Sequence, residues 1–198
     1  AGINPELSQY YLEPKEVFTT PEFIFTYSTE GKGGVSRNLH RWARNYHIIG
    51  GTEPRDILLN SWEGVYFNVN QEGMNQMMQG FAEIGGELFV MDDGWFGDKY
   101  PRDNGESSLG DWVVCEKKLP EGIGALIDEA ERNNLKFGIW IEPEMCNTKS
   151  ELYEKHPDWV LRQPDREPSK GRGGTQLVLD MCNPEVQDHV FNVVDNLM

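Results

Sequence analysis

From residue 56 onward, short apolar runs alternate with segments whose apolar residues recur at helical spacing. The runs that predict strands are 57–62, 88–91 and 137–141, and the helical stripes that follow them are 74–84, 123–130 and 186–197. Between the last strand and the last helix lies a long insertion, in which the apolar runs 159–161 and 177–179 predict a hairpin. Consecutive strand–helix units form parallel sheets with right-handed crossovers. The pattern therefore predicts an α/β fold, either an open doubly wound sheet or part of an eight-stranded barrel.

The first 55 residues follow a different pattern. Aromatic residues alternate along 23–27, which predicts an antiparallel strand with one buried side. After the glycine-rich stretch 31–34, apolar residues at helical spacing over 35–46 predict an amphipathic helix. Glycine and proline at 50–54 then indicate a boundary near 48–56.

Charge and apolar content limit the kinds of partner. The chain carries 33 acidic against 18 basic residues, a formal net charge of −15, which repels nucleic acid and anionic lipid. No apolar run approaches the length of about 20 residues that a membrane span needs. We therefore expect neither a nucleic-acid partner nor a membrane partner. Cys115, Cys146 and Cys182 lie far apart in no paired spacing, which predicts free thiols and no structural zinc.

Polar and aromatic side chains gather where each predicted strand ends. They are Asn60, Trp62 and Glu63 after the first strand, Asp92, Asp93 and Trp95 after the second, and Trp140, Glu142 and Glu144 after the third. In a barrel, the carboxyl ends of the strands open onto one mouth, where active sites lie. Carboxylates accept hydrogen bonds from hydroxyls, and the C–H face of a sugar ring packs on an indole, so this set suits a carbohydrate. No glycine-rich nucleotide-binding motif follows any of these strands.

The adjacent acids Asp92 and Asp93 are the most unusual members of this set. Aspartate is a poor strand residue and two neighbouring carboxylates repel each other, so local structure does not favour the pair. Gly94 permits a sharp turn directly after it. Both carboxylates can therefore reach the mouth and bind two neighbouring hydroxyls.

Structural interpretations compete with each of these candidates. The aspartate pair can form a turn, cap a helix or bind a hard cation, although no histidine lies nearby to favour a transition metal. Trp62 and Trp140 can belong to the core, which is the commoner fate of a tryptophan on a strand. Glu142 and Glu144 can be solvated loop charges, and Arg172 can be a surface loop residue.

A series of longer motifs runs through the chain in a fixed order. The motifs are NSWEG at 60–64, FVMDDGWFG at 89–97, LGDW at 109–112, KLPEG at 118–122, LKFGIWIEPEM at 135–145, HPDWVL at 156–161 and QLVLDMCNPEV at 176–186. In order and spacing, the series resembles the microbial α-galactosidases of glycoside hydrolase family 36. The resemblance implies the end of a β-sandwich at 1–30, a helical linker at 31–55, and the first three βα units of a (β/α)8 TIM barrel at 56–198.

The resemblance also implies an activity and a set of partners. The family carries out retaining hydrolysis of terminal α-galactosides such as melibiose and raffinose, with no metal and no organic cofactor. The expected partners are accordingly α-galactoside oligosaccharides, and the expected parent protein is a homo-oligomer. The compartment is not determined, and a bacterial cytoplasm or periplasm is the expectation.

Carried over residue by residue, the resemblance predicts a galactose pocket. Asp92 and Asp93 match the acid pair that accepts hydrogen bonds from sugar hydroxyls, including the axial hydroxyl that distinguishes galactose from glucose. Trp62 and Trp140 match the indoles of the pocket wall. Arg172 matches the pocket arginine, although Arg172-Gly-Gly-Thr-Gln176 is longer than the family's more usual Arg-Asn-Gln.

The resemblance places the catalytic carboxylates outside this chain. The family's nucleophile is an aspartate in a Lys-Trp-Asp type motif on the next strand, and its acid/base aspartate follows later. We therefore expect a fragment that binds galactose, contains no catalytic residue and is inactive when isolated. Two alternatives stay open, a galactosyltransferase that makes raffinose-type sugars and a non-catalytic sugar-binding module.

Overall fold

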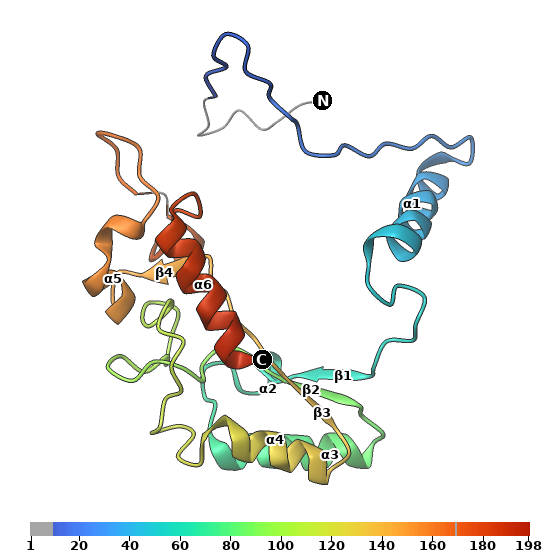
Figure 1. Ribbon diagram of the computed structural model, residues 1–198. Coiled ribbons are helices and arrows are strands. Elements are labelled where there is room, and N and C mark those ends of the chain that lie inside the picture. Colours follow the sequence, from blue (N-terminus) through green and yellow to red (C-terminus); the bar gives the residue numbers. More distant parts are fainter. Residues whose placement is uncertain (1–9, 169) are drawn as a thin grey trace. The chain divides into compact units, whose positions relative to one another are not determined.

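The computed structural model describes residues 10–168 and 170–198, and the chain divides into two units, Ala1–Pro54 and Arg55–Met198 (Figure 1). The division falls inside the stretch 48–56, where glycine and proline residues predict a boundary. None of the helices formed by the described residues is long and apolar enough to cross a membrane.

The first unit contains the predicted helix, which begins earlier than expected. Helix α1 spans Gly31–Trp42 and continues into the π-helical turn η1, Ala43–His47. Its first turn is the glycine stretch that the sequence pattern left outside the helix. Gly34 is buried, and a side chain there would collide with Ser28 and Glu30. A glycine is therefore needed because the preceding chain crosses the helix at this point.

The prediction of a strand at 23–27 is wrong. Phe23, Phe25 and Tyr27 do alternate along the segment, but they are exposed, and the segment forms no strand. A strand requires a hydrogen-bonded partner, and residues 10–54 supply none to this segment. Residues 1–9, the start of the predicted sandwich segment, lie outside the described residues.

The second unit is built on a three-stranded parallel sheet, as the strand–helix pattern predicts. Its strands are β1 (Leu58–Asn60), β2 (Leu88–Met91) and β3 (Lys136–Ile139), in the order β1-β2-β3. Its helices are α2 (Trp62–Val65), α3 (Gln71–Glu83), α4 (Gly122–Arg132) and α6 (Pro184–Leu197). Leu59, Phe89 and Phe137 lie in register across the sheet. The fold is mixed α/β, with α3 and α4 side by side along the sheet (Figure 1).

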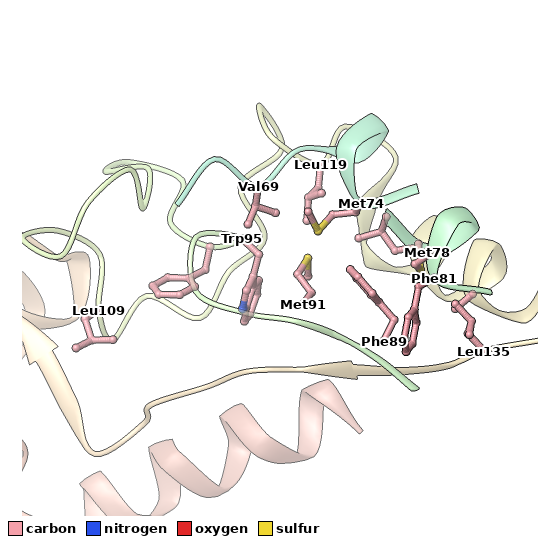
Figure 2. Close-up of a cluster of buried hydrophobic side chains, with 13 residues drawn as sticks. Val69, Met74, Met78, Phe81, Phe89, Met91, Trp95, Leu109, Leu119 and Leu135 are labelled. Atoms are coloured by element: carbon pink, nitrogen blue, oxygen red, sulfur yellow. The ribbon is translucent and has the colours of Figure 1, made fainter. Parts of the chain in front are cut away.

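The main core fills the space between the sheet and the helices α3 and α4 (Figure 2). Phe89 and Met91, alternate residues of β2, are fully buried. Met74, Met78 and Phe81 follow one another at helical spacing on α3 and belong to the same cluster. Each such side chain contributes about 1.5–3 kcal/mol on burial. This packing determines which face of β2 points inward and so positions the acid pair at its end.

A smaller antiparallel sheet forms in the insertion between β3 and α6. Its strands are β4 (Met145–Asn147) and β5 (Gln176–Val178), and the insertion also holds α5 (Glu151–Lys155) and two 3-10 turns, η2 (Pro157–Trp159) and η3 (Arg172–Gly174). The predicted hairpin between 159–161 and 177–179 is wrong except for one bridge. Val160 bridges to Leu179, but no strand forms at 159–161. Pro157 begins a 3-10 turn there, and β4 is the strand that pairs with β5.

The three cysteines are free thiols, as predicted. Cys115 and Cys146 are buried, whereas Cys182 is exposed. Burial raises the pKa of the Cys146 thiol to about 12, and the nearby Asp111 carboxylate adds to the effect. Cys146 is therefore a protonated core residue at neutral pH.

Asp111 of the LGDW motif caps a helix that lies far from it in sequence. Its carboxylate oxygens accept hydrogen bonds from the backbone N–H groups of Glu151 and Leu152, each at 2.9 Å, in the first turn of α5. Burial raises the pKa of Asp111, while these two hydrogen bonds oppose that shift. The motif therefore joins the insertion to the loop that follows β2.

We expect Asp111→Ala in the full-length protein to lower the free energy of unfolding by about 1–3 kcal/mol, because two N–H groups lose their acceptor. Denaturant unfolding followed by tryptophan fluorescence measures the change. Glu116→Ala, at an exposed position shortly after it in sequence, is the matched control and should unfold like the unmodified protein. Identical unfolding midpoints for the two variants would contradict the capping role.

Candidate functional site

A cavity of about 450 Å³ opens at the carboxyl end of the parallel strands. Its lining residues are Trp62, Phe67, Asp92, Asp93, Arg102, Asn104, Gly105, Glu106, Trp140, Glu142, Arg172, Gly173, Thr175 and Gln176. All five residues predicted for the sugar pocket are among them. The structure therefore brings together side chains that are up to 110 residues apart, from Trp62 to Arg172.

The Asp92 carboxylate is held by the end of the neighbouring strand. Asn60 Nδ2 donates to Asp92 Oδ2 at 2.5 Å, and the Asp93 backbone N–H donates to Asp92 Oδ1 at 2.7 Å. The Asp92 N–H donates in turn to Ser61 Oγ at 3.0 Å. Each carboxylate oxygen thus uses one lone pair within the protein and keeps acceptor capacity. Asp92 is half-buried and is oriented before any ligand arrives.

The Asp93 carboxylate is paired with a guanidinium that the sequence analysis missed. Arg102 Nε donates to Asp93 Oδ1 and Arg102 Nη2 donates to Asp93 Oδ2, each at 2.8 Å. The Arg102 side chain is 1% exposed and that of Asp93 9% exposed. Arg102 Nη1 also donates to Ser107 O at 2.7 Å and to Asn147 Oδ1 at 2.9 Å. Asp93 and Arg102 therefore form a buried, bidentate ion pair, and Arg102 Nη1 has acceptors of its own in Ser107 and Asn147.

No hydrophobic periodicity in the sequence around Arg102 predicts where its side chain lies. The available signal was electrostatic, because a predicted pair of carboxylates at the edge of a core requires a nearby cation. Between residues 98 and 108, in the loop after β2, the basic residues are Lys99 and Arg102. Structure separates the two, since Lys99 pairs with Glu154 on the surface. Two aromatic rings flank the Arg102 guanidinium, Phe67 at 5.3 Å and Phe96 at 5.6 Å.

The two predicted indoles are half-buried rather than enclosed in the core. Trp62 packs edge-on against Phe67, with ring centroids 5.0 Å apart and planes at 90°. Trp140 packs edge-on against Trp112 at 6.0 Å, and its carbonyl accepts a hydrogen bond from Trp95 Nε1 at 3.0 Å. Both side chains are held by other aromatic residues while part of their surface lines the cavity.

Glu142 and Arg172 complete the polar wall from the third strand end and the insertion. Glu142 is half-buried in the cavity, although its loop position also allowed a solvated charge. Burial raises the pKa of Glu142, and the negative charge of Glu144 raises it further. Arg172 is exposed at the start of η3, where Gly173 adopts a φ of 66° that allows the tight turn. Arg172 therefore lies at the outer edge of the cavity.

The described residues that line the cavity include carboxylates, guanidinium groups and indoles. Within residues 10–168 and 170–198, no group of three or more His, Cys, Asp and Glu side chains lies close enough to hold a metal ion. Oriented acceptors beside flat apolar surfaces can bind a neutral ligand that carries both hydroxyls and C–H faces.

Comparisons with known proteins agree with the sequence motifs. A family model described as Melibiase matches residues 17–198. Alpha-galactosidase AgaA of Geobacillus stearothermophilus is 43% identical over 199 residues, and the match covers 100% of this chain and 27% of that protein. Probable alpha-galactosidase C of Aspergillus flavus is 42% identical over 206 residues, with the same shares covered. This chain thus spans about a quarter of the length of these curated relatives.

The fold is shared as well. A crystal structure of an AgaA variant in complex with stachyose matches with a TM-score of 0.77 at 42% sequence identity. The match covers 83% of this chain and 23% of that one. The parallel sheet and its connections therefore correspond to part of a larger structure.

The Asp93–Arg102 pair predicts a large loss of stability when the cation is removed. We expect Arg102→Met in the full-length protein to cost about 3–5 kcal/mol, because it leaves a buried carboxylate without a counter-charge. Denaturant unfolding measures the change. Arg37→Met is the matched control, since Arg37 pairs with Glu30 where both side chains are more than half exposed. Equal unfolding midpoints for the two variants would show that the buried pair is not stabilising.

Proposed function

Since this chain belongs to the Melibiase family, the α-galactosidases of glycoside hydrolase family 36, we propose that its cavity binds the terminal galactose of an α-galactoside. The whole protein would be a retaining α-galactosidase that hydrolyses sugars such as melibiose and raffinose. Residues 1–198 would contribute the end of a β-sandwich, a linker helix and the first three βα units of a (β/α)8 barrel. The whole protein would be a homo-oligomer.

One observation carries this proposal: two oriented carboxylates and two half-buried indoles line the same cavity. A pyranose ring has hydroxyl donors around its edge and C–H groups on its faces. Acceptors held in place lose little conformational entropy when they bind those hydroxyls, and the indoles cover the apolar faces. Sugar binding thus uses both the carboxylates and the indoles of the cavity.

Asp92 and Asp93 would have different parts in this site. Asp92 has spare acceptor capacity on both oxygens, and among the described residues its hydrogen-bond donors are both neutral, Asn60 Nδ2 and the Asp93 N–H. Asp93 has its charge balanced by Arg102, so it would accept hydrogen bonds as a stabilised carboxylate. A carboxylate in such a pair is a poor nucleophile, because attack on carbon would remove its charge from the guanidinium.

Hydrolysis would therefore depend on carboxylates outside this chain. Retaining glycosidases place two carboxyl groups about 5–5.5 Å apart on opposite sides of the scissile bond. Asp92 and Asp93 are adjacent residues at the end of one strand, and we assign them to binding. We also propose that residues 1–198 alone turn over no substrate.

Asp92→Asn in the full-length protein tests the assignment. An amide would turn one acceptor into a donor and remove charge assistance, so kcat/KM for a nitrophenyl α-galactoside should fall roughly 30-fold to 1000-fold, about 2 to 4 kcal/mol. Asp98→Asn, on an exposed part of the same loop and outside the cavity, is the control and should keep its activity. Near-normal kcat/KM for Asp92→Asn would rule out the sugar-binding role.

Asp93→Asn should behave differently from Asp92→Asn because of its partner. Removal of the Asp93 charge leaves the buried Arg102 guanidinium without its counter-ion. We expect Asp93→Asn to lose stability as well as kcat/KM, whereas Asp92→Asn should lose mainly kcat/KM. Unfolding midpoints and kinetics measured on both variants separate the two effects, and equal loss of stability in both would contradict this division.

A further inference from the structure

The KLPEG motif at 118–122 has no part in the cavity lining, yet its first residue makes an unusual set of contacts. Lys118 Nζ donates hydrogen bonds to three backbone carbonyls, those of Phe67 at 2.8 Å, Gly94 at 2.9 Å and Arg102 at 2.8 Å. The same ammonium pairs with Asp103 Oδ1 at 2.9 Å. The Lys118 side chain is only 12% exposed. A lysine ammonium has three N–H donors, and here three carbonyls accept them.

The three carbonyls belong to three separate segments around the cavity. Phe67 follows β1 and α2 and lines the cavity, Gly94 directly follows Asp93, and Arg102 is the partner of Asp93. Three carbonyl oxygens directed at one point repel one another unless a cation lies between them. The Lys118 ammonium is that cation, so it allows the three segments to converge.

The position of Lys118 itself is set independently of these carbonyls. Its backbone N–H donates to Cys115 O at 3.0 Å, and its carbonyl accepts from Gln71 N at 3.0 Å, at the start of α3. The next residue, Leu119, is 1% exposed within the main core (Figure 2). The backbone of Lys118 is thus held between α3 and the core by contacts that do not involve its ammonium.

Gly94 shows how closely these segments approach. It has a φ of 116°, and a side chain there would lie 3.0 Å from the Cα and the carbonyl oxygen of Phe67. The turn after the acid pair therefore lies against the segment that carries an aromatic wall residue. A small movement of this contact would shift Asp93 relative to Phe67.

We propose that Lys118 is a positioning residue of the sugar site: its ammonium holds the Asp93–Gly94 turn, Phe67 and Arg102 in the arrangement that presents the Asp93–Arg102 pair. The inference rests on the proposed binding of galactose. Lys118 lies outside the cavity lining and acts through the residues whose carbonyls it binds. It therefore affects binding of the sugar without contact to it.

Lys118→Met and Lys118→Arg in the full-length protein test the proposal. Methionine keeps the length of the side chain and removes all three donors. Arginine keeps the charge, but its planar fork spreads the N–H groups and cannot direct them to the same three carbonyls. For a nitrophenyl α-galactoside and for galactose as an inhibitor, we expect KM and Ki of Lys118→Met to rise about 10- to 100-fold. The rise should be smaller for Lys118→Arg.

The measurement separates positioning from stability alone. Kinetics are normalised to the folded fraction at a temperature where the variants are folded, and Lys118→Arg decides the question if Lys118→Met does not fold. Lys99→Met is the control and should keep KM and Ki, because Lys99 is a surface lysine of the loop after β2 that pairs with Glu154 and not with the carbonyls that Lys118 binds. Unchanged KM and Ki in a Lys118 variant, with only a smaller folded fraction, would overturn the proposal.

Amide hydrogen exchange gives a readout that needs no substrate. If Lys118 holds the segments together, exchange in 92–96 and 102–104, on either side of residue 99, should be faster in both Lys118 variants and unchanged in Lys99→Met. Unchanged exchange there would overturn the positioning role. Failure of the unmodified full-length protein to cleave the galactoside would refute the proposed function. The exchange result would still test whether Lys118 holds the three segments together.

Discussion

The carboxylate of Asp93 is buried, and a buried charge is tolerated only when an opposite charge and hydrogen bonds replace the water it has lost. Arg102 provides both, with two bonds to Asp93 and two more to Ser107 O and Asn147 Oδ1. Because Asn147 belongs to β4, this one guanidinium ties the end of β2 to the loop after it and to the second sheet. Much of the cavity wall depends on that connection.

The surrounding contacts make the site rigid before a ligand binds. Asn60 orients Asp92 from the neighbouring strand, and Lys118 gathers the carbonyls of Phe67, Gly94 and Arg102. A binding site whose groups are already held in place spends less free energy on ordering when the ligand arrives. For a sugar, whose hydroxyls otherwise bond equally well to water, this preorganisation determines whether binding is favourable.

Local patterns in the sequence predicted the second unit well because they report local physics. The strand at 88–91 follows from its apolar run and the three main helices from helical spacing, and both are set by the residues of each segment alone. The segment 23–27 alternates aromatic residues and still forms no strand, since a strand also needs a partner that its own residues cannot supply. The run at 159–161 likewise contributes one bridge, because Pro157 starts a turn immediately before it.

The sequence by itself determined the parallel βα order, the identity of the family and the five candidate residues Trp62, Asp92, Asp93, Trp140 and Arg172. Only the tertiary structure decided that these residues line one cavity and that, within the described part of the chain, Asp93 forms an ion pair while Asp92 forms none. Arg102 and Lys118 lie in irregular loops, where no periodicity relates a side chain to its surroundings. Their roles arise from burial, which makes an unpaired charge or carbonyl costly and so selects the partner that folding brings near.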